Sequence, residues 1–490
     1  MRKRGRLLKY VSQVVSLLII DLVAFFIVLV SISDFSVNLK FVVLTVSGLS
    51  ILIVTYIRTS DYIHPVQVFV GPWIMLLAMY QIQWMNELQQ PPLKSEVFFA
   101  IIFSCFCFIF GWAFSHIRFS TAVKRRPFLP MRRYLWDHSR VEVLAWLCLI
   151  LGLIVWIYFF IRAGGFISLF KNPTYFKLHF FSPILDDVYR LLPFSGFLFL
   201  WIAITATSKR KKLLSVYIWF LTALLILATL ARSELFLYLA VSGFIYAQKR
   251  RVRLYKICIS VLFILGLFVG IQAFREGDFS SYDKIDRGIY AMDWDVAWIE
   301  PLIRYTVPNI RNIQIAMDNC SEHTFGAHTF YPIFSFTRTT DLLPFKKARG
   351  KLETARRRKE YGIGIFIPYL AEIYWDFGWI GVICFPFFIG YLSSGIFYKA
   401  KKTGGAKYIF LYAIMAYALM FSLQKNTFSD SNVWILTGLV LVADLVLRTK
   451  NQCPVKAGRG LLPKGEPSEM SQPVKIVEAM HNESESQYDF

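Results

Sequence analysis

Unbroken apolar runs, each about as long as a lipid bilayer is thick, recur along this 490-residue chain. A helix needs about 20 mostly apolar residues to cross a hydrocarbon core of about 30 Å. Charged residues make up 18% of the chain, against roughly a quarter of an ordinary soluble domain. The sequence therefore predicts an all-α polytopic membrane protein with about twelve transmembrane helices, at residues 12–31, 41–57, 66–84, 96–114, 141–161, 191–207, 213–230, 234–247, 257–273, 366–397, 408–424 and 433–447.

The distribution of positive charge predicts the orientation of these helices. Lys and Arg gather in alternate connections, including HIRFSTAVKRRPFLPMRRYLWDHSR, SKRKK and QKRRVRLYK. The positive-inside rule places these connections and both termini in the cytoplasm. No small-residue cleavage site follows the first apolar run, so we expect it to remain as an anchor. Topology thus explains the net charge of +22, and we expect no nucleic-acid partner.

The spans divide the chain into four parts. Residues 1–273 hold helices 1–9 and an external segment at 162–190, and residues 274–364 form a large external loop. Residues 365–449 hold the last three helices. Residues 450–490 lack an apolar run and are rich in Pro, Gly, Ser, Glu and Lys, which predicts a disordered cytoplasmic tail.

The large external loop contains aromatic residues of a kind that can hold sugars. In DRGIYAMDWDVAWIEPLIRYTVPNIRNIQIAMDNC, apolar residues lie near helical spacing, so this stretch should fold on the membrane surface. Trp294, Trp298 and Tyr331 offer flat rings for stacking on the C–H faces of sugars. Packing, or an interfacial aromatic belt, is the alternative for each ring.

Arginines at the external membrane face are candidates for binding phosphate. Arg232 lies in a very short connection in ATLARSELFLY, Arg275 ends the ninth span, and Arg304 stands in PLIRYTVPN. Charge at this depth is costly and usually functional, although a long side chain can also extend to the headgroups. The basic stretch that contains Arg356, Arg357 and Arg358 suits either a phosphorylated substrate or anionic lipid headgroups.

Carboxylates near the same face are candidates for a general base. Glu372 and Asp376 are spaced i, i+4 where a span begins, so they share one helix face. Compensation of charge at the helix N-terminus is the alternative explanation. Asp293 and Asp295 form a D-x-D pattern of the kind that holds a divalent cation on a diphosphate, but two aspartates in one loop are a weak signal. We expect neither a metal nor another cofactor.

Several segments together resemble a known family. They are TSDYIHPVQVFVGPW, the ARSE connection, and FGAHTFYPIF followed by GIFIPYLAEIYWDFGWIGVICFPFFIGYL. They are similar to the bacterial oligosaccharide repeat-unit polymerases, the Wzy-type O-antigen and capsule polymerases. The likeness in layout covers residues 10–447. The family's S-x-I-x-x-L-x-E-x-Y-x-x-F-G-x-x-G pattern is matched without its initial serine.

The resemblance implies a membrane glycosyltransferase of GT-C-like architecture in the bacterial cytoplasmic (inner) membrane. Its substrates would be oligosaccharides linked to undecaprenyl diphosphate, polymerised outside the membrane with inversion and release of the lipid diphosphate. The resemblance assigns diphosphate binding to Arg232, Arg275 and Arg304. The acceptor hydroxyl needs a base, for which Glu372 is our first candidate, before Asp376, Glu300 and His328. A chain-length regulator and a flippase are possible protein partners.

Two other functions remain open. An O-antigen ligase would use the same donor with a different acceptor, and sequence separates it poorly from a polymerase. A flippase for lipid-linked oligosaccharides would also have about a dozen spans. We would expect paired halves in such a transporter, and the sequence has no internal repeat.

Overall fold

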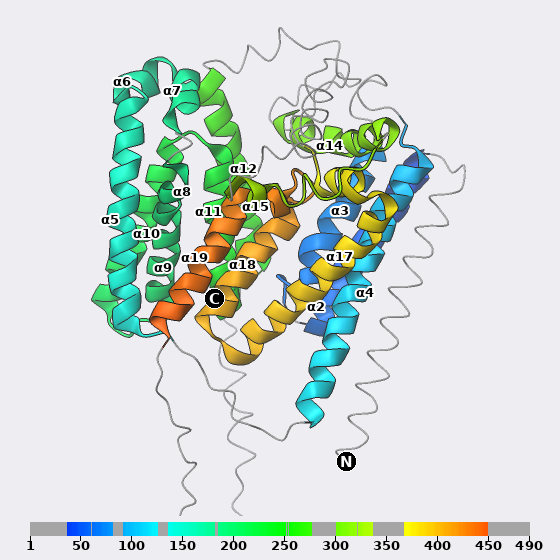
Figure 1. The fold of residues 1–490 in the computed structure, drawn as a ribbon, viewed down its shortest axis with the longest axis horizontal. Helices are drawn as coiled ribbons and strands as arrows, with labels where there is room; N and C mark the ends of the chain where they lie inside the picture. The colour runs from blue at the N-terminus through cyan, green and yellow to red at the C-terminus, as the bar shows by residue number, and fades with distance from the viewer. Residues whose placement is uncertain are drawn as a thin grey trace, which may run out of the picture. The chain divides into compact units, whose positions relative to one another are not determined.

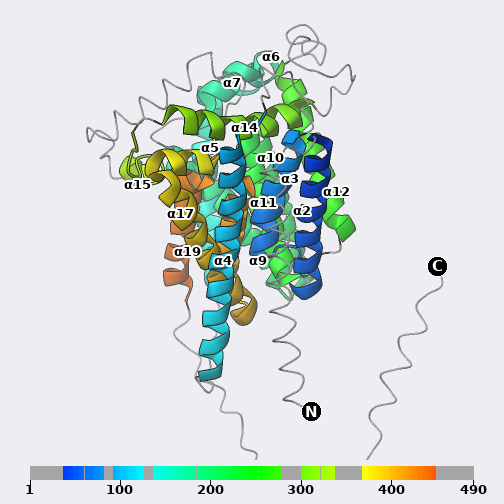
Figure 2. The ribbon, with the colours of Figure 1, turned by 90° about the vertical axis from the view of Figure 1, so that its right-hand side faces the viewer.

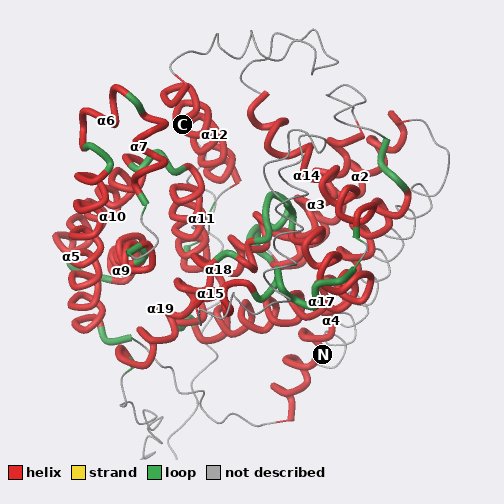
Figure 3. The backbone as a smooth tube through the Cα atoms, turned by 45° about the horizontal axis from the view of Figure 1, so that its top comes forward, coloured by secondary structure: helices red, strands yellow, loops and turns green. Residues whose placement is uncertain are grey.

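The computed structural model describes residues 37–59, 61–81, 92–125, 136–181, 185–250, 252, 254–276, 300–320, 322–336 and 367–448. These residues form helices and no β-strand (Figure 3), apart from a single bridge between Trp136 and Arg448. Figures 1 and 2 show the helices, which are α2 (Val37–Thr59), α3 (Pro65–Gln81), α4 (Ser95–Arg125), α5 (His138–Arg162), α6 (Gly165–Lys171), α7 (Pro173–Phe180), α8 (Asp186–Tyr189), α9 (Leu191–Thr205), α10 (Lys209–Ala228), α11 (Arg232–Lys249), α12 (Leu254–Glu276), α14 (Glu300–Asn319), α15 (Tyr331–Phe336), α17 (Tyr369–Thr403), α18 (Ala406–Phe421), the 3₁₀ turn η3 (Thr427–Ser429) and α19 (Ser431–Leu447).

The predicted all-α fold is confirmed for the described residues, and the helices indicate a protein embedded in a membrane. Six of them are long and apolar enough to cross a bilayer, within 39–57, 95–118, 138–162, 186–205, 209–228 and 369–403. Every predicted span overlaps a helix except 12–31, which lies outside the described residues. Shorter apolar helices occupy 255–264, 406–421 and 431–447.

The helices pack as neighbours that run in alternating directions. We call the end where α9, α11, α17 and α19 begin the upper end, after its place in Figure 1. On one side α5 and α10 pack on α9, and on the other side α2, α3, α4 and α17 pack together. Helix α18 joins them, because it contacts α11, α17, α3 and α19. Helix α14 lies across the upper end (Figure 2), on α3, α4 and α17.

Local signals in the sequence explain where several helices begin and end. The Asp137 side chain accepts a hydrogen bond from Ser139 N (2.9 Å) at the start of α5, and Asp430 does the same for Asn432 N (3.0 Å) at the start of α19. Gly404 caps the end of α17, and its φ of +59° is left-handed and suits a glycine.

Helix α17 is interrupted, which the apolar pattern of the sequence does not predict. The apolar run at 366–397 suggested one continuous span, but Gly378 has φ +59° and ψ −146° and divides the helix. A span requires roughly 20 residues. The part of α17 after Gly378 is long enough for one, so the part before Gly378 can run in another direction. This short first half carries both Glu372 and Asp376.

Helices α4 and α17 approach each other closely at two glycines. A Cβ on Gly111 would lie 2.0 Å from the carbonyl oxygen of Phe387, and one on Gly390 would lie 2.2 Å from that of Phe108. Since these neighbours are backbone atoms, the helices would have to separate to accommodate any side chain. Small residues permit such close packing between membrane helices.

Replacing Gly390 by alanine is therefore expected to destabilise the protein by about 1–3 kcal/mol. Gly438→Ala on α19 is the matched control, because nothing lies within 4 Å of the added methyl group. It should leave stability unchanged or raise it slightly, since alanine favours a helix. Thermal unfolding in detergent measures both variants. Equal melting temperatures for the two variants would contradict the close contact.

Candidate functional site

A buried ion pair joins three helices at the upper end. Arg190, between α8 and α9, is 3% exposed, and Glu234 in the first turn of α11 is 9% exposed. The Arg190 guanidinium donates to the Glu234 carboxylate and also contacts Asp186 at 3.1 Å. Asn432 of α19 donates to the other Glu234 oxygen at 3.3 Å. The pair thereby fixes the start of α11 against α9 and α19.

Glu372 lies against the connection between α18 and α19. Its Oε2 atom accepts hydrogen bonds from Asn426 Nδ2 (2.7 Å) and Ser429 Oγ (3.2 Å). In the same connection Lys425 forms an ion pair with Asp430. The segment QKNTFSDSN thus links Glu372 on α17 to Glu234 on α11. We call Arg190, Glu234, Glu372, Asn426 and Asn432 the polar cluster.

Asp376 and Glu372 are i, i+4 neighbours, but their side chains contact different segments of the chain. Asp376 is fully buried. Its carboxylate accepts from Thr329 N (2.7 Å), Thr329 Oγ1 (2.6 Å), His328 N (3.2 Å) and the Thr324 hydroxyl. With four donors on its two oxygens, this carboxylate holds segment 324–329 in place.

The same segment completes the interrupted helix. Thr324 N donates to Trp375 O at 3.1 Å, and Phe325 N donates to Asp376 O at 3.0 Å. The break at Gly378 leaves these two carbonyl groups without their partners within the helix. A Cβ on Gly378 would lie 2.8 Å from Nε2 of His323, so the residue just before this segment also covers the break. Broken membrane helices need such replacement partners for their backbone.

Replacing Asp376 by alanine is expected to destabilise the protein by about 3 kcal/mol, because it leaves several buried donors without an acceptor. The change should also expose segment 324–329 to protease. The control is Asp318→Ala on α14, whose carboxylate is exposed and forms a surface ion pair with Lys94; such pairs contribute about 1 kcal/mol or less. Unfolding in detergent with limited proteolysis tests both. Unchanged melting and cleavage in the Asp376 variant would contradict this role.

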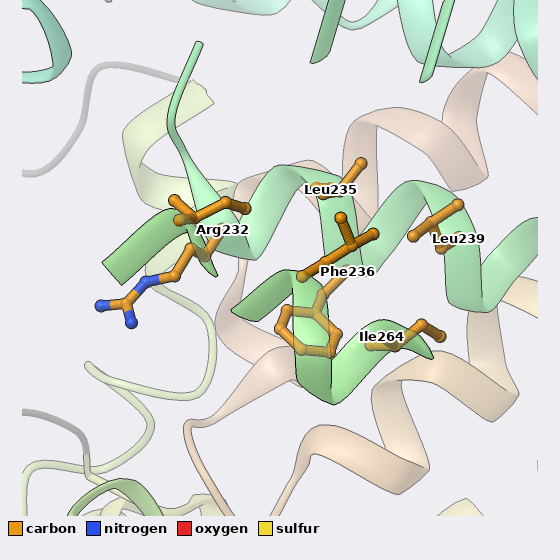
Figure 4. Close-up of a pocket in the computed structure, with 7 residues that line it drawn as sticks. Arg232, Leu235, Phe236, Leu239 and Ile264 are labelled. Atoms are coloured by element: carbon orange, nitrogen blue, oxygen red, sulfur yellow. The ribbon is translucent and has the colours of Figure 1, made fainter. Parts of the chain in front are cut away.

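Arg232 begins α11 after an unusually tight turn. Leu230 has φ +55°, a left-handed conformation that is rare for a branched residue. The Thr229 hydroxyl accepts a hydrogen bond from Ala231 N at 3.2 Å and so stabilises the turn. Figure 4 shows the Arg232 guanidinium extending away from Leu235 and the other apolar side chains beside it.

An apolar groove adjoins Arg232. It has a volume of about 520 Å³. It lies between the turn that joins α10 to α11, the upper part of α12, and α6. A smaller hollow that includes Arg232 shares Leu267 and Ile271 of α12 with it. The residues that line the groove are Leu169, Leu227, Ala228, Leu230, Phe263, Gly266, Leu267, Gly270 and Ile271.

The other predicted residues are placed only in part. Tyr331 begins α15 and is half-buried, and His328 is buried beside Asp376. Arg275 lies in the last turn of α12, and Glu300 and Arg304 lie in the first turns of α14, but their side chains are outside the description. Outside the described residues lie Trp294, Trp298, Asp293, Asp295 and Arg356–Arg358.

Sequence reasoning missed Arg190, Asn426 and Asn432. In the sequence, Arg190 is the last residue of an external segment, and QKNTFSDSN is a short connection between two spans. The available signal was a cluster of amide, hydroxyl and charged side chains between two apolar runs. Within the described ranges, no three metal-ligating side chains lie together. Comparisons with protein-family models, curated proteins and solved structures give no match.

Proposed function

We propose that this protein is a membrane glycosyltransferase that polymerises oligosaccharide repeat units carried on undecaprenyl diphosphate. One observation carries the proposal: an apolar groove, an arginine and a carboxylate-containing polar cluster lie at one end of the bundle. A prenyl chain requires an apolar surface, a diphosphate requires fixed positive charge, and a sugar hydroxyl requires hydrogen-bonding groups and a base. The arrangement supplies all three.

Arg232 and the groove suit the lipid diphosphate. In the proposed reaction an acceptor hydroxyl attacks the anomeric carbon from the side opposite the diphosphate. The bond from that carbon to the diphosphate oxygen breaks, and the electron pair leaves with the diphosphate. A guanidinium at this place stabilises the charge that develops, and binds phosphate oxygens in a bidentate manner. Arg275 and Arg304 are proposed to assist.

Glu372 is the proposed base that takes the proton from the acceptor hydroxyl. Its hydrogen bonds to Asn426 and Ser429 would fix the carboxylate's direction. Asp376, whose oxygens already accept four hydrogen bonds, is assigned the positioning of segment 324–329. Trp294, Trp298 and Tyr331 are proposed to stack on sugar rings.

The proposal also assigns an orientation in the membrane. The upper end faces outward from the bacterial cytoplasmic membrane, with both termini in the cytoplasm. About twelve spans form a GT-C-like architecture, and no metal or other cofactor takes part. The charge distribution of the sequence supports this orientation.

The decisive experiment deletes the gene in its host and separates the surface glycan by length on a gel. A polymerase predicts surface chains that stop at one repeat unit. Loss of even that unit contradicts the proposal, and the lipid-linked glycan then distinguishes the alternatives. Polymer accumulating on undecaprenyl diphosphate indicates a ligase, whereas single units retained inside indicate a flippase.

Restoring the gene with Arg232→Ala is expected to yield little or no polymer, because the leaving diphosphate loses its cation. Arg210→Ala is the matched control, since Arg210 is an exposed arginine at the opposite end of α10. It should restore the full ladder of chain lengths. Immunoblots of the membrane fraction check that both variants are present in equal amounts. A full ladder with Arg232→Ala would show that the diphosphate binds elsewhere.

A further inference from the structure

Helix α6 has an apolar face that stays largely exposed, although the ring of Phe166 contacts that of Phe160 on α5. Phe166, Ile167 and Phe170 are 67%, 72% and 67% exposed. On the other side of the helix Leu169 is buried and lines the groove. Large adjacent apolar side chains on a surface mark a place where something apolar binds. Helix α6 has only seven residues, so these three side chains make up most of its outer face.

This face continues the exposed stripe of α5. Ile150, Ile154, Ile157 and Ile161 recur at helical spacing on α5 and are 44–69% exposed. In a membrane protein such a stripe faces lipid. Gly164 and Gly165 follow at once, with φ of +92° and +60°, and turn the chain into α6. The apolar surface of α6 therefore begins where the lipid-facing surface of α5 ends.

The position of α6 is fixed by the helix after it. Phe176 and Phe180 of α7 are fully buried and pack on Phe159 and Phe160 of α5, with ring centroids 5.6 Å apart for the pairs 159–180 and 160–176. Asn172 caps α7 by accepting a hydrogen bond from Tyr175 N at 3.0 Å. Helix α7 also contacts α12. The exposed face of α6 is thus presented by a packed element.

Charged residues flank this face on both sides. Arg162 ends α5 and Lys171 ends α6, and both are exposed. Basic residues next to apolar ones are typical of segments that lie in the headgroup region, where their charges meet lipid phosphates. The neighbouring surface, the apolar residues and the charges all fit the same partner, a lipid leaflet.

We propose that α6 is an interfacial helix whose Phe166, Ile167 and Phe170 insert into the bilayer at the boundary between acyl chains and headgroups. Leu169, on its inner face, then forms the edge at which the groove meets that boundary. A lipid-linked molecule in the same leaflet would reach the groove past this helix. The insertion itself depends only on the membrane environment and not on the reaction proposed above.

Photo-cross-linking of the full-length protein tests this inference. The photoreactive residue p-benzoylphenylalanine replaces Phe166 or Phe170 in protein reconstituted into vesicles of phosphatidylethanolamine and phosphatidylglycerol. After irradiation, intact-protein mass spectrometry should find a mass increase of one phospholipid at either position. Phe176 and Ile218 on α10 are buried and serve as two control positions, so that one remains if the other prevents folding.

The outcomes separate the possible partners of α6. Lipid adducts at 166 and 170 but not at the control positions support insertion. A cross-link to a second copy would overturn the proposal, as would lipid adducts no more frequent than at the controls. The cross-linking does not measure activity, so the two proposals can fail separately. If lipid adducts form but the deletion strain makes normal glycan, the proposed polymerase is rejected and the insertion of α6 stands.

Discussion

Replacing Glu372 by glutamine is expected to slow chain elongation by about 10²–10⁴-fold, the usual contribution of a general base. The side-chain oxygen of glutamine still accepts a hydrogen bond where Oε2 accepts those of Asn426 and Ser429, so the fold should persist. The measurement is the rate of elongation by purified protein in vesicles supplied with lipid-linked repeat units. The rate constant should fall while the concentration for half-maximal rate changes little.

The control for this variant is Glu142→Gln on α5. The Glu142 carboxylate forms an ion pair with Lys211. The side chain of Glu142 is 38% exposed and that of Lys211 is 58% exposed. It lies near the start of α5, away from the upper end. Its variant should elongate chains at the normal rate. If the Glu372 variant does the same, another group must accept the proton, and Glu372 serves only to position the connection between α18 and α19.

Replacing Glu234 by alanine is expected to destabilise the protein by about 3–5 kcal/mol, because it leaves the Arg190 charge buried without its main partner. Among the acidic residues that the structure describes, Asp186 remains beside the guanidinium, with its side chain 33% exposed. The measurement is thermal unfolding in detergent, followed by size-exclusion chromatography to detect aggregation. An unchanged melting temperature would contradict a structural role for the pair.

A double variant separates loss of stability from loss of function. Arg190→Met together with Glu234→Met removes both charges, and replacing a buried pair by apolar residues is often neutral or stabilising. We expect this variant to melt close to the wild type. If it folds but does not elongate chains, the polar cluster contributes to the reaction as well as to the fold. If it elongates normally, the pair has a structural role only.

The length of the apolar runs was sufficient to predict the helical fold. Each run restricts what the chain can form, since a bilayer leaves the helix as the simplest way to satisfy the backbone. The candidates Arg232, Glu372 and Asp376 were found because charges next to spans stand out in an apolar sequence. The break at Gly378 was not predicted, because glycines are common in membrane helices and only φ identifies this one.

The partners of the candidate residues could not be predicted. Glu234 and Asn432 are 198 positions apart, and Glu372 and Asn426 are 54 apart. Sequence periodicity reports only on neighbours along one helix, whereas these contacts depend on how distant helices are arranged. For the same reason Asp376 looked equivalent to Glu372, although one faces segment 324–329 and the other faces the connection before α19.

The contacts of α3 have a consequence for the order in which the protein is assembled. Trp73 Nε1 of α3 donates to Ser422 Oγ at 3.2 Å, and the Tyr412 hydroxyl donates to Ile63 O just before α3. Each pair is 349 positions apart. When the ribosome has made α3, these partners have not yet been synthesised. Helix α3 therefore stays in the membrane or in the insertion machinery without these hydrogen bonds until α18 is inserted. Truncation before residue 406 should therefore leave α3 as a target for quality-control proteases.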